Sequence, residues 1–333
     1  MLLYIGIDEA GYGPMLGPLC VGLAALRIDD WEPSQPAPNA WKLLRSAVCR
    51  KPGDKKRRLA VADSKKLCKP MAMGAGRLAE AERSVLAFVR ARTGSIPATD
   101  AALFECLAVG PCALHWYGGQ PLPCPGHADA AEAGIAANTL ARAMARAGVA
   151  CTLQRVARTD EARFNAQLEG GRSKANTTLA AIAEHAPAIL DLIERTRLEH
   201  EREHGEGNVH TRIVLDRQGG RTRYQDALAR VFGRPLRTLA EAPEASTYQF
   251  VDVPNARIRV QPRAEEAHLP VALASMQAKL VRELTMERFN AYWRERRPEV
   301  KPTAGYTTDA RRWLADMEGA ISADERRVLV RLA

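Results

Sequence analysis

Two aspartates follow short apolar runs, where a folded chain can present them to a cleft. Asp8 follows the run over residues 2–7, and Asp216 follows the run over residues 213–215. If both runs are buried strands of one sheet, their carboxyl ends can bring the two acids together. Converging carboxylates repel each other unless a cation lies between them, and hard divalent cations prefer oxygen ligands. An aspartate after a strand is also a common turn former or helix cap, so the pattern alone leaves both interpretations open.

The surroundings of these acids form five sequence blocks in a fixed order. The blocks are GIDEAGYGPMLGP over 6–18, VADSKKL over 61–67, LDRQG over 215–219, RAE with PVALASMQAK over 263–279, and GYTTD over 305–309. Together they resemble the type 2 ribonucleases H (ribonuclease HII), in particular the archaeal and eukaryotic branch. Two further features, Glu265 and the pair Phe164-Asn165 with the segment after Asn176, resemble the related type 3 enzymes (ribonuclease HIII).

The resemblance implies a fold and a catalytic centre. The fold is α/β and ribonuclease H-like, with a mixed central sheet flanked by helices, an enlarged middle region over about 93–210 and a helical C-terminal part. The implied catalytic residues, which are also the metal ligands, are Asp8, Glu9, Asp216 and Glu265. They would hold two Mg²⁺ or Mn²⁺ ions, and oxygen-only ligands suit these metals. Two such ions about 4 Å apart can activate a water and relieve the charge on the leaving oxygen of a phosphodiester.

The resemblance also assigns the residues that contact nucleic acid. These are Gly11, Tyr12, Gly13, Ser64, Lys65 and Tyr306, the last of which would stack on the sugar beside the RNA–DNA junction. The less favoured alternative for Tyr306 is an ordinary half-buried tyrosine in a loop between helices. Lys279 and Arg282 could face either the nucleic acid or solvent, and the sequence does not distinguish the two.

Two positions depart from the family pattern. The family has a Gly-Arg-Gly turn whose arginine reads a 2′-hydroxyl, and here the turn is Gly11-Tyr12-Gly13. A phenol cannot replace a charged, multidentate guanidinium, so the preference between single ribonucleotides and long RNA tracts is open. Glu265 stands where most type 2 enzymes have aspartate, which shifts one ligand by a methylene without removing it.

These residues predict an endonuclease that cuts the RNA strand of RNA/DNA hybrids, or DNA with embedded ribonucleotides, leaving 3′-hydroxyl and 5′-phosphate ends. The alternative is a nucleic-acid-binding protein on the same fold that no longer cleaves or has changed its specificity. Four buried acids without a metal would be costly, which favours the enzyme. By the resemblance, archaeal and bacterial relatives act as monomers while eukaryotic ones require two accessory subunits, and of these two states we expect a monomer.

Charge is concentrated in one segment of this 333-residue chain. The net charge is +9, from 48 Lys and Arg against 39 Asp and Glu. Residues 42–69 hold eleven basic side chains and two acids, which accounts for the whole excess. This segment is either a polyanion-binding patch or a solvated loop.

The remaining sequence predicts alternating strands and helices. Strands are expected over 2–7, 18–28, 59–62, 149–156, 213–215, 247–253 and 257–261, and helices over 70–92, 128–147, 173–204 with a break near Pro187, 222–232 and 270–294, followed by two short ones. Residues 29–55 and 110–126 are expected to be surface loops. We expect a catalytic domain over 1–265 and a helical part over 266–333 packed on the same domain.

Composition excludes several classes of protein. The seven cysteines are odd in number and form no C-x-x-C pair, so they are expected to be reduced thiols. No apolar stretch reaches the about 20 residues that a bilayer requires, and acidic residues interrupt the N-terminal apolar run. We therefore expect a cytoplasmic protein without membrane contact.

Overall fold

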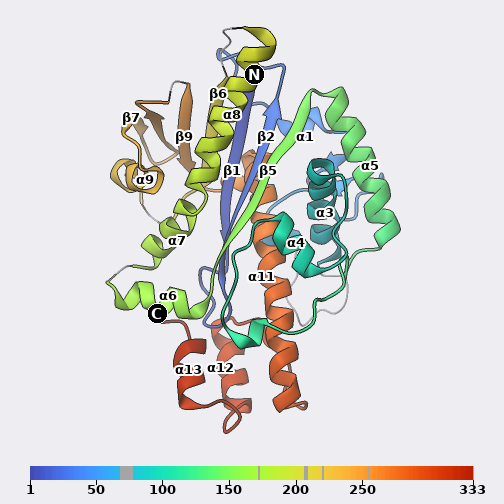
Figure 1. Ribbon diagram of the computed structural model, residues 1–333, viewed down its shortest axis with the longest axis vertical. Helices are drawn as coiled ribbons and strands as arrows, with labels where there is room; N and C mark the ends of the chain where they lie inside the picture. Colours follow the sequence, from blue (N-terminus) through green and yellow to red (C-terminus); the bar gives the residue numbers. More distant parts are fainter. Residues whose placement is uncertain (68–77, 172, 206–208, 220, 254, 333) are drawn as a thin grey trace.

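A computed structural model describes the chain from residue 1 to 332, except for residues 68–77, 172, 206–208, 220 and 254. Part of the helix expected over 70–92 lies outside the described residues, and its remainder is α3 (Ala79–Thr93). The chain forms a central mixed sheet with helices on both faces, which confirms the predicted α/β architecture (Figure 1).

The sheet has seven strands in the order β5-β2-β1-β6-β9-β8-β7. Their bounds are β1 Leu2–Ala10, β2 Leu19–Ile28, β5 Val149–Thr159, β6 His210–Asp216, β7 Leu236–Glu241, β8 Ser246–Phe250 and β9 Ala256–Gln261. β1 and β2 form an antiparallel hairpin, and β5 continues the antiparallel pairing. β1, β6 and β9 run parallel to one another, so their carboxyl ends meet at one edge. A small second sheet pairs β3 (Val48–Cys49) with β4 (Leu59–Ala60).

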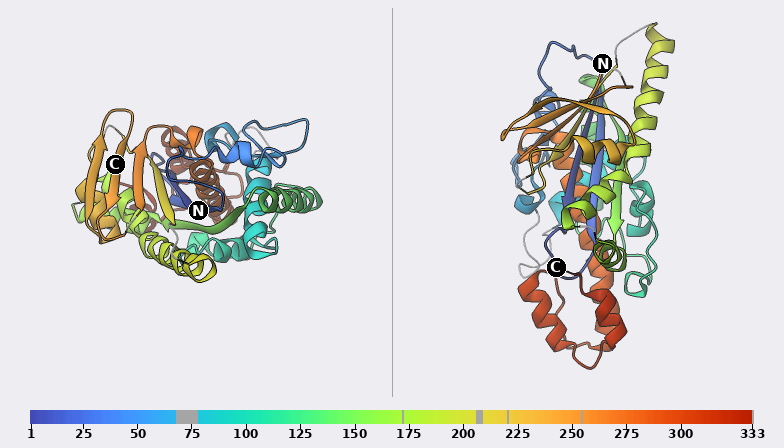
Figure 2. Two further views of the ribbon diagram at one scale, coloured as in Figure 1. Left: turned by 90° about the horizontal axis from the view of Figure 1, so that it is seen from above. Right: turned by 90° about the vertical axis from the view of Figure 1, so that its left-hand side faces the viewer.

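Helices cover both faces of the sheet. Their bounds are α1 Ala40–Leu43, α2 Ser64–Leu67, α4 Asp100–Cys106, α5 Ala130–Arg146, α6 Glu161–Glu169, α7 Lys174–Ala183, α8 Ala186–His204, α9 Gln225–Phe232, α10 Ala264–Ala267, α11 Leu269–Arg296, α12 Thr307–Asp316 and α13 Ala323–Leu329. Helices α7, α8 and α9 share one apolar core with the sheet, and α11 lies on the opposite face against β1 and β2 (Figure 2). Helices α12 and α13 pack with the second half of α11 in a third apolar cluster.

Glycines allow α11 to lie directly on the sheet. A side chain at Gly6 would come within 2.1 Å of the backbone nitrogen of Val271, and one at Gly22 within 2.1 Å of the carbonyl oxygen of Ala274. The backbone of α11 therefore touches the backbones of β1 and β2, which is possible only where no Cβ stands between them. This contact fixes the position of α11 relative to the end of β1.

Three regions differ from the expected elements. Residues 29–55 are less loop-like than predicted, because buried Trp31, Trp41 and Val48 anchor α1 and β3 in the core. Strand β7 was not predicted, since five of its six residues are exposed and its pattern lacks a buried face. Helices α4 and α6 were also missed, and within 110–126 residues His115–Tyr117 form a short 3₁₀ turn.

The expected break near Pro187 is confirmed, because α7 ends at Ala183 and α8 begins at Ala186. Among the helices that the structure describes, none has the length and apolar content needed to cross a bilayer.

Candidate active site

Parallel pairing brings three of the predicted acids to one edge of the sheet. Ile7 on β1 lies opposite Leu215 on β6. The next residues, Asp8 and Asp216, therefore lie at the same height along these two neighbouring strands. The backbone N–H of Ala264 donates a hydrogen bond of 2.9 Å to Oδ1 of Asp216. Glu265 is the next residue along the chain and therefore lies at the same edge, one strand further across the sheet.

The four acids are close enough that their charges raise one another's pKa values. Burial raises the pKa of Asp8 well above its usual value, and repulsion from Glu9 raises it further. Burial, followed by repulsion from Asp216, raises the pKa of Glu9 to about 7. Burial also raises the pKa of Asp216, and burial together with the Asp216 charge raises that of Glu265. Four acids in this environment resist ionisation unless a positive charge joins them.

The acids fit a divalent cation by chemistry but are not in ligand geometry as they stand. Oε2 of Glu265 is buried and has no hydrogen-bond partner among the described residues, which is a costly state for a carboxylate oxygen. Within that same part of the chain, no three His, Cys, Asp or Glu side chains are grouped closely enough to hold a metal ion. The four acids that the sequence singled out, Asp8, Glu9, Asp216 and Glu265, are all carboxylates. Their oxygen-only donor set suits Mg²⁺ or Mn²⁺.

Ser275 on α11 is a site residue that sequence analysis did not single out. Its hydroxyl forms a hydrogen bond with the Asp8 carboxylate, which favours the ionised form of that acid. The same hydroxyl lies 3.0 Å from Oγ of Ser64, which is itself buried. Ser64 therefore points toward α11 in this structure. Ser275 lies in the fourth sequence block, but only its position against Asp8 reveals a role.

Lys65 is the basic residue that the structure places beside the acids. Its side chain is exposed, and its charge lowers the pKa of both Glu9 and Asp216. Its backbone N–H donates a hydrogen bond of 2.9 Å to Oδ1 of Asp63. Asp63 lines a pocket of about 300 Å³ with Glu265, and its charge raises the Glu265 pKa, so Asp63 is a fifth acid near the site.

The basic segment over 42–69 is neither wholly free nor wholly paired. Arg58 forms an ion pair of 2.9 Å with Asp54, and this contact lowers the Asp54 pKa to about 2. Arg50 donates a hydrogen bond to the carbonyl oxygen of Glu266, and its guanidinium carbon lies 3.7 Å from the centre of the Trp41 ring. The Arg58–Asp54 pair neutralises one charge inside the segment, and Arg50 binds the segment to α10 through the Glu266 carbonyl.

The Gly11-Tyr12-Gly13 turn follows the acid pair directly. Gly11 has φ +88°, and a Cβ there would come within 2.5 Å of the carbonyl oxygen of Pro18, so only glycine fits. At Gly13 a Cβ would meet no atom within 4 Å, which means that the space beside it is open. Tyr12 is 39% exposed. The turn thus presents a phenol and an open backbone surface to solvent.

Arg282 on α11 supports this turn from inside the protein. Its side chain is fully buried, which excludes both roles that the sequence left open for it. Nη1 pairs with Oε1 of Glu283 at 3.0 Å, and Nη2 donates to the carbonyl oxygen of Ala304 at 2.9 Å. The guanidinium also lies 5.4 Å from the ring centre of Tyr306, which is 49% exposed. Lys279 pairs with Glu283 at 2.7 Å and is likewise not free.

Tyr306 is brought beside the turn by a close backbone contact. The carbonyl oxygen of Gly305 accepts hydrogen bonds from the backbone N–H groups of Met15 and Leu16, at 2.8 Å and 3.1 Å. The start of α12 therefore touches the loop that follows Gly13. The structure brings Tyr12 and Tyr306 to neighbouring segments, although they are almost 300 residues apart in the sequence.

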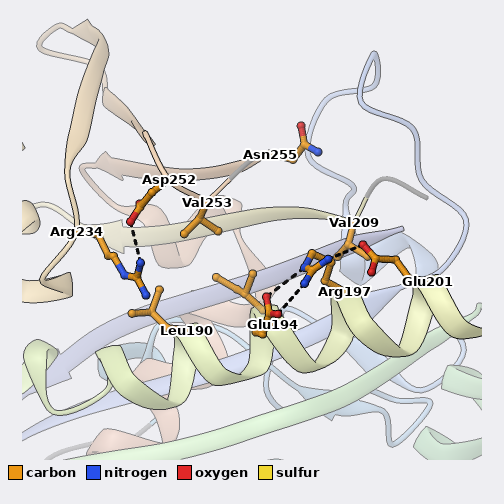
Figure 3. Close-up of a pocket in the computed structure, with 10 residues that line it drawn as sticks. Leu190, Glu194, Arg197, Glu201, Val209, Arg234, Asp252, Val253 and Asn255 are labelled. Carbon is orange, nitrogen blue, oxygen red and sulfur yellow. Dashed lines mark hydrogen bonds and ion pairs between the residues drawn. The ribbon is translucent and has the colours of Figure 1, made fainter. Parts of the chain in front are cut away.

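A separate pocket of about 580 Å³ lies between α8 and the turn from β8 to β9 (Figure 3). Its charged side chains pair with one another. Arg197 contacts Glu194 at 2.7 Å and Glu201 at 2.6 Å, and Arg234 contacts Asp252 at 2.8 Å. Because each charge in the pocket already has a partner, we assign it no ligand.

The chain is similar to ribonucleases HII and HIII of known structure. Ribonuclease HII from Archaeoglobus fulgidus, solved in a complex with PCNA, matches 99% of this chain over 94% of its own, with 16% identity and a TM-score of 0.46. Ribonuclease H2 from Pyrococcus horikoshii OT3 matches 93% of this chain over 83% of its own, with 14% identity and a TM-score of 0.43. Bst-RNase HIII in complex with Mn²⁺ matches 99% of this chain, with 14% identity and a TM-score of 0.40, and this chain covers 65% of it. No protein-family model and no curated protein matches the sequence.

Proposed function

We propose that this chain is a metal-dependent endoribonuclease of the type 2 ribonuclease H family. It would hydrolyse the RNA strand of RNA/DNA hybrids, or DNA at embedded ribonucleotides, and leave 3′-hydroxyl and 5′-phosphate ends. The observation that carries this proposal is the convergence of one buried and three half-buried acids at the carboxyl edge of β1, β6 and β9, on the residues that the sequence blocks supply.

The proposed metal ligands are Asp8, Glu9, Asp216 and Glu265. The unpartnered Oε2 of Glu265 and the raised pKa values of all four acids support this assignment, because a divalent cation would offset both the burial of these carboxylates and the repulsion between them. When bound, two Mg²⁺ or Mn²⁺ ions would supply an activated water and neutralise charge at the scissile phosphate.

The other residues would position the substrate. Lys65 is exposed beside Glu9 and Asp216, where its ammonium group can contact a phosphate. The open backbone at Gly13 can approach a minor groove closely. Tyr12 and Tyr306 are exposed residues on two segments that one backbone contact joins, where each could stack on a sugar or base.

We also propose the division of roles along the chain. Residues 1–265 would form the catalytic part and residues 266–333 a helical part packed on it. The helical part would contribute Ser275 as a partner of Asp8 and the exposed Tyr306 as a contact to the substrate.

Cleavage of end-labelled duplexes tests the proposal. Three duplexes of equal length would contain no ribonucleotide, one ribonucleotide or a long RNA tract, and each would be incubated with Mg²⁺, with Mn²⁺ and with a chelator. We expect metal-dependent cutting only where ribonucleotides are present. Binding without cutting in both metals would instead favour the alternative, a protein on this fold that binds nucleic acid but does not cleave it.

A further inference from the structure

Four arginines occupy one face of the sheet beyond the acid site. Arg212 on β6 lies opposite Arg257 on β9, and Arg259 is two residues further along β9. Arg257 lies opposite Gln249 on β8, and Gln249 lies opposite Arg237 on β7. Side chains alternate along a strand, and the intervening residues of these strands are in the apolar core, so the arginines share the other face. We refer to Arg212, Arg237, Arg257 and Arg259 as the arginine face.

The arginine face is open to solvent. Arg237, Arg257 and Arg259 are exposed, and Arg212 is half-buried. A pocket of about 210 Å³ lies among Arg212, Arg257 and Arg259 and reaches Thr247 and His268. Helices α8 and α9 belong to the core of the opposite face, and α11 covers β1 and β2. The arginines are therefore on a part of the sheet that an external ligand can reach.

In the described part of the chain, no acid is paired with this charge. Among the residues that the structure describes, no ion pair involves any of the four arginines. Their contacts are with neutral groups: Arg212 with the carbonyl oxygen of Gln35, Arg237 with Gln249 and Arg259 with Gln261. Like charges placed opposite each other destabilise a sheet, and Arg212 and Arg257 are such a pair. A missing counter-charge of this kind is expected where an external anion binds.

The arginine face is continuous with the proposed catalytic edge. Asp216 is on the same face of β6 as Arg212, and it pairs with Gln261, two residues after Arg259. At a rise of about 3.3 Å per residue, Arg259 is about 7 Å and Arg257 about 13 Å before the level of Asp216 along the strands. The larger distance corresponds to about four nucleotides of one strand in a duplex.

We infer that the arginine face binds the phosphate backbone of the nucleic acid that extends from the catalytic edge. The inference rests on the proposed function, because it places a phosphodiester at Asp216. Guanidinium groups bind phosphates through two parallel hydrogen bonds, and the strand positions between them offer the hydroxyl of Thr247 and the amide of Gln249. These groups suit a backbone rather than bases, so the contact is independent of sequence.

The test compares two double variants of the full chain, each of which removes two exposed charges. Arg257→Gln/Arg259→Gln removes half of the arginine face. Arg142→Gln/Arg146→Gln removes exposed arginines from α5, which packs near β5 at the opposite end of the sheet. For wild type and both variants, affinity for an RNA/DNA hybrid of about 25 base pairs would be measured with Ca²⁺ between about 50 and 200 mM salt. Cleavage of the same hybrid in Mg²⁺ would be measured in parallel.

We expect the slope of log affinity against log salt to become shallower by about 1.8 in Arg257→Gln/Arg259→Gln, since each lost phosphate contact removes about 0.9. The α5 variant should retain the wild-type slope. Equal slopes in all three proteins, with the wild type still cleaving, would overturn the inference and leave the proposed function intact. Failure of wild type to cleave or bind any hybrid would instead count against the proposed function.

An acidic protein is the competing ligand for the arginine face. Competition with poly-glutamate distinguishes an acidic protein from a nucleic acid as the ligand, because poly-glutamate carries negative charge without the geometry of phosphate groups. If Arg257→Gln/Arg259→Gln weakens poly-glutamate binding but leaves hybrid binding unchanged, the face serves a protein and the inference is wrong. The inference is supported if Arg257→Gln/Arg259→Gln binds the hybrid more weakly and poly-glutamate does not displace the hybrid from the wild type.

Discussion

The guanidinium of Arg331 donates a hydrogen bond to the carbonyl oxygen of Gly11, with 2.5 Å between Nη1 and the oxygen. Nη2 donates to the carbonyl oxygen of Tyr12 at 3.0 Å, and the guanidinium carbon lies 3.8 Å from the ring centre of Phe164. Asn165 holds the same segment by accepting from the backbone N–H of Leu332 at 2.8 Å. The turn after the acid pair is thus supported by residues from α6 and from the last described segment of the chain.

Arg331→Met should loosen this turn without unfolding the protein. Methionine keeps an apolar stem against Phe164 but removes the charged donors, and hydrogen bonds from charged groups contribute about 1.5 to 3 kcal/mol each. We expect a lower melting temperature, faster amide hydrogen exchange over residues 11–17 and slower hybrid cleavage. Arg327→Met is the matched control, because Arg327 pairs with Asp324 in solvent and should contribute less than about 1 kcal/mol. Unchanged exchange in Arg331→Met would show that the turn does not depend on this contact.

Asp8→Asn and Asp216→Asn should each reduce cleavage by at least about a thousandfold, because several kcal/mol of charge stabilisation depend on the ligands. Both should keep or raise the melting temperature of the metal-free protein, since the acids repel one another. Initial cleavage rates in Mg²⁺ and thermal unfolding in a chelator measure the two effects. Asp226→Asn, on the exposed surface of α9, is the control. Near wild-type rates in either site variant would rule out the proposed carboxylate centre.

Stability without metal should fall as pH rises. The pKa values of Glu9 and Glu161 are both raised to about 7, so between about pH 4.5 and 7 the folded state binds more protons than the unfolded state. The contribution of these two acids to the free energy of unfolding therefore decreases with pH. His185 and His268, whose pKa values burial lowers to about 4, act in the opposite direction only below about pH 6.5, so the fall in stability is expected above that pH. Mg²⁺ should restore stability at pH 8 and have little effect at pH 5, because it binds the ionised carboxylates.

Two variants separate the contributions to this pH dependence. Glu9→Gln should flatten the pH dependence of the melting temperature and weaken the effect of Mg²⁺. Glu161→Gln should flatten the pH dependence alone, because Glu161 lies away from the proposed metal ligands, with the backbone N–H of Gly17 and the hydroxyl of Tyr117 as its partners. A Mg²⁺ effect that persists in full in Glu9→Gln would contradict the role of that residue as a ligand.

Gly11→Ala and Gly13→Ala should affect different properties, the first the stability of the fold and the second the KM for a hybrid. Alanine at Gly11 requires a left-handed backbone and a contact of 2.5 Å with the carbonyl oxygen of Pro18, so it should destabilise the fold by more than about 1 kcal/mol. Alanine at Gly13 meets no atom of the protein, so the melting temperature should not change. If the backbone at Gly13 approaches nucleic acid, Gly13→Ala should still raise KM for a hybrid. An unchanged KM would show that the substrate does not touch this residue.

Tyr12 should make a single embedded ribonucleotide a poorer substrate than a long RNA tract. The family arginine would contribute a charged hydrogen bond of roughly 1.5 to 3 kcal/mol, which is about ten- to more than a hundredfold in rate. Tyr12→Arg should therefore recover cutting at a single ribonucleotide preferentially, whereas Tyr12→Ala should not. If Tyr12 stacks on a sugar or base instead, both variants should lose a substrate that the wild type prefers. Equal cutting of both duplexes by wild type and Tyr12→Arg would show that the turn does not set specificity.

Local sequence was sufficient to predict the elements that carry the acids. Continuous apolar runs ending in Asp8 and Asp216 predicted buried strands, and β1 and β6 confirm them, because a strand buried on both faces has few alternatives. The break before Pro187 and the long helix after Glu265 were predicted from proline and from apolar composition in the same way. Strand β7 could not be predicted, since its pairing with β8 and not its own pattern makes it a strand.

The tertiary structure alone decided which distant residues complete the site. Ser275 contacts Asp8 because Gly6 and Gly22 let α11 lie directly on the sheet, a packing contact that no local pattern encodes. The sequence left Arg282 open between nucleic acid and solvent and singled out nothing at Arg331, yet both are buried against backbone carbonyl groups near the Gly11 turn. The arginine face likewise arises from register, which places arginines of separate strands side by side. Residue type is a local property, whereas burial and charge proximity depend on which segments the fold brings together.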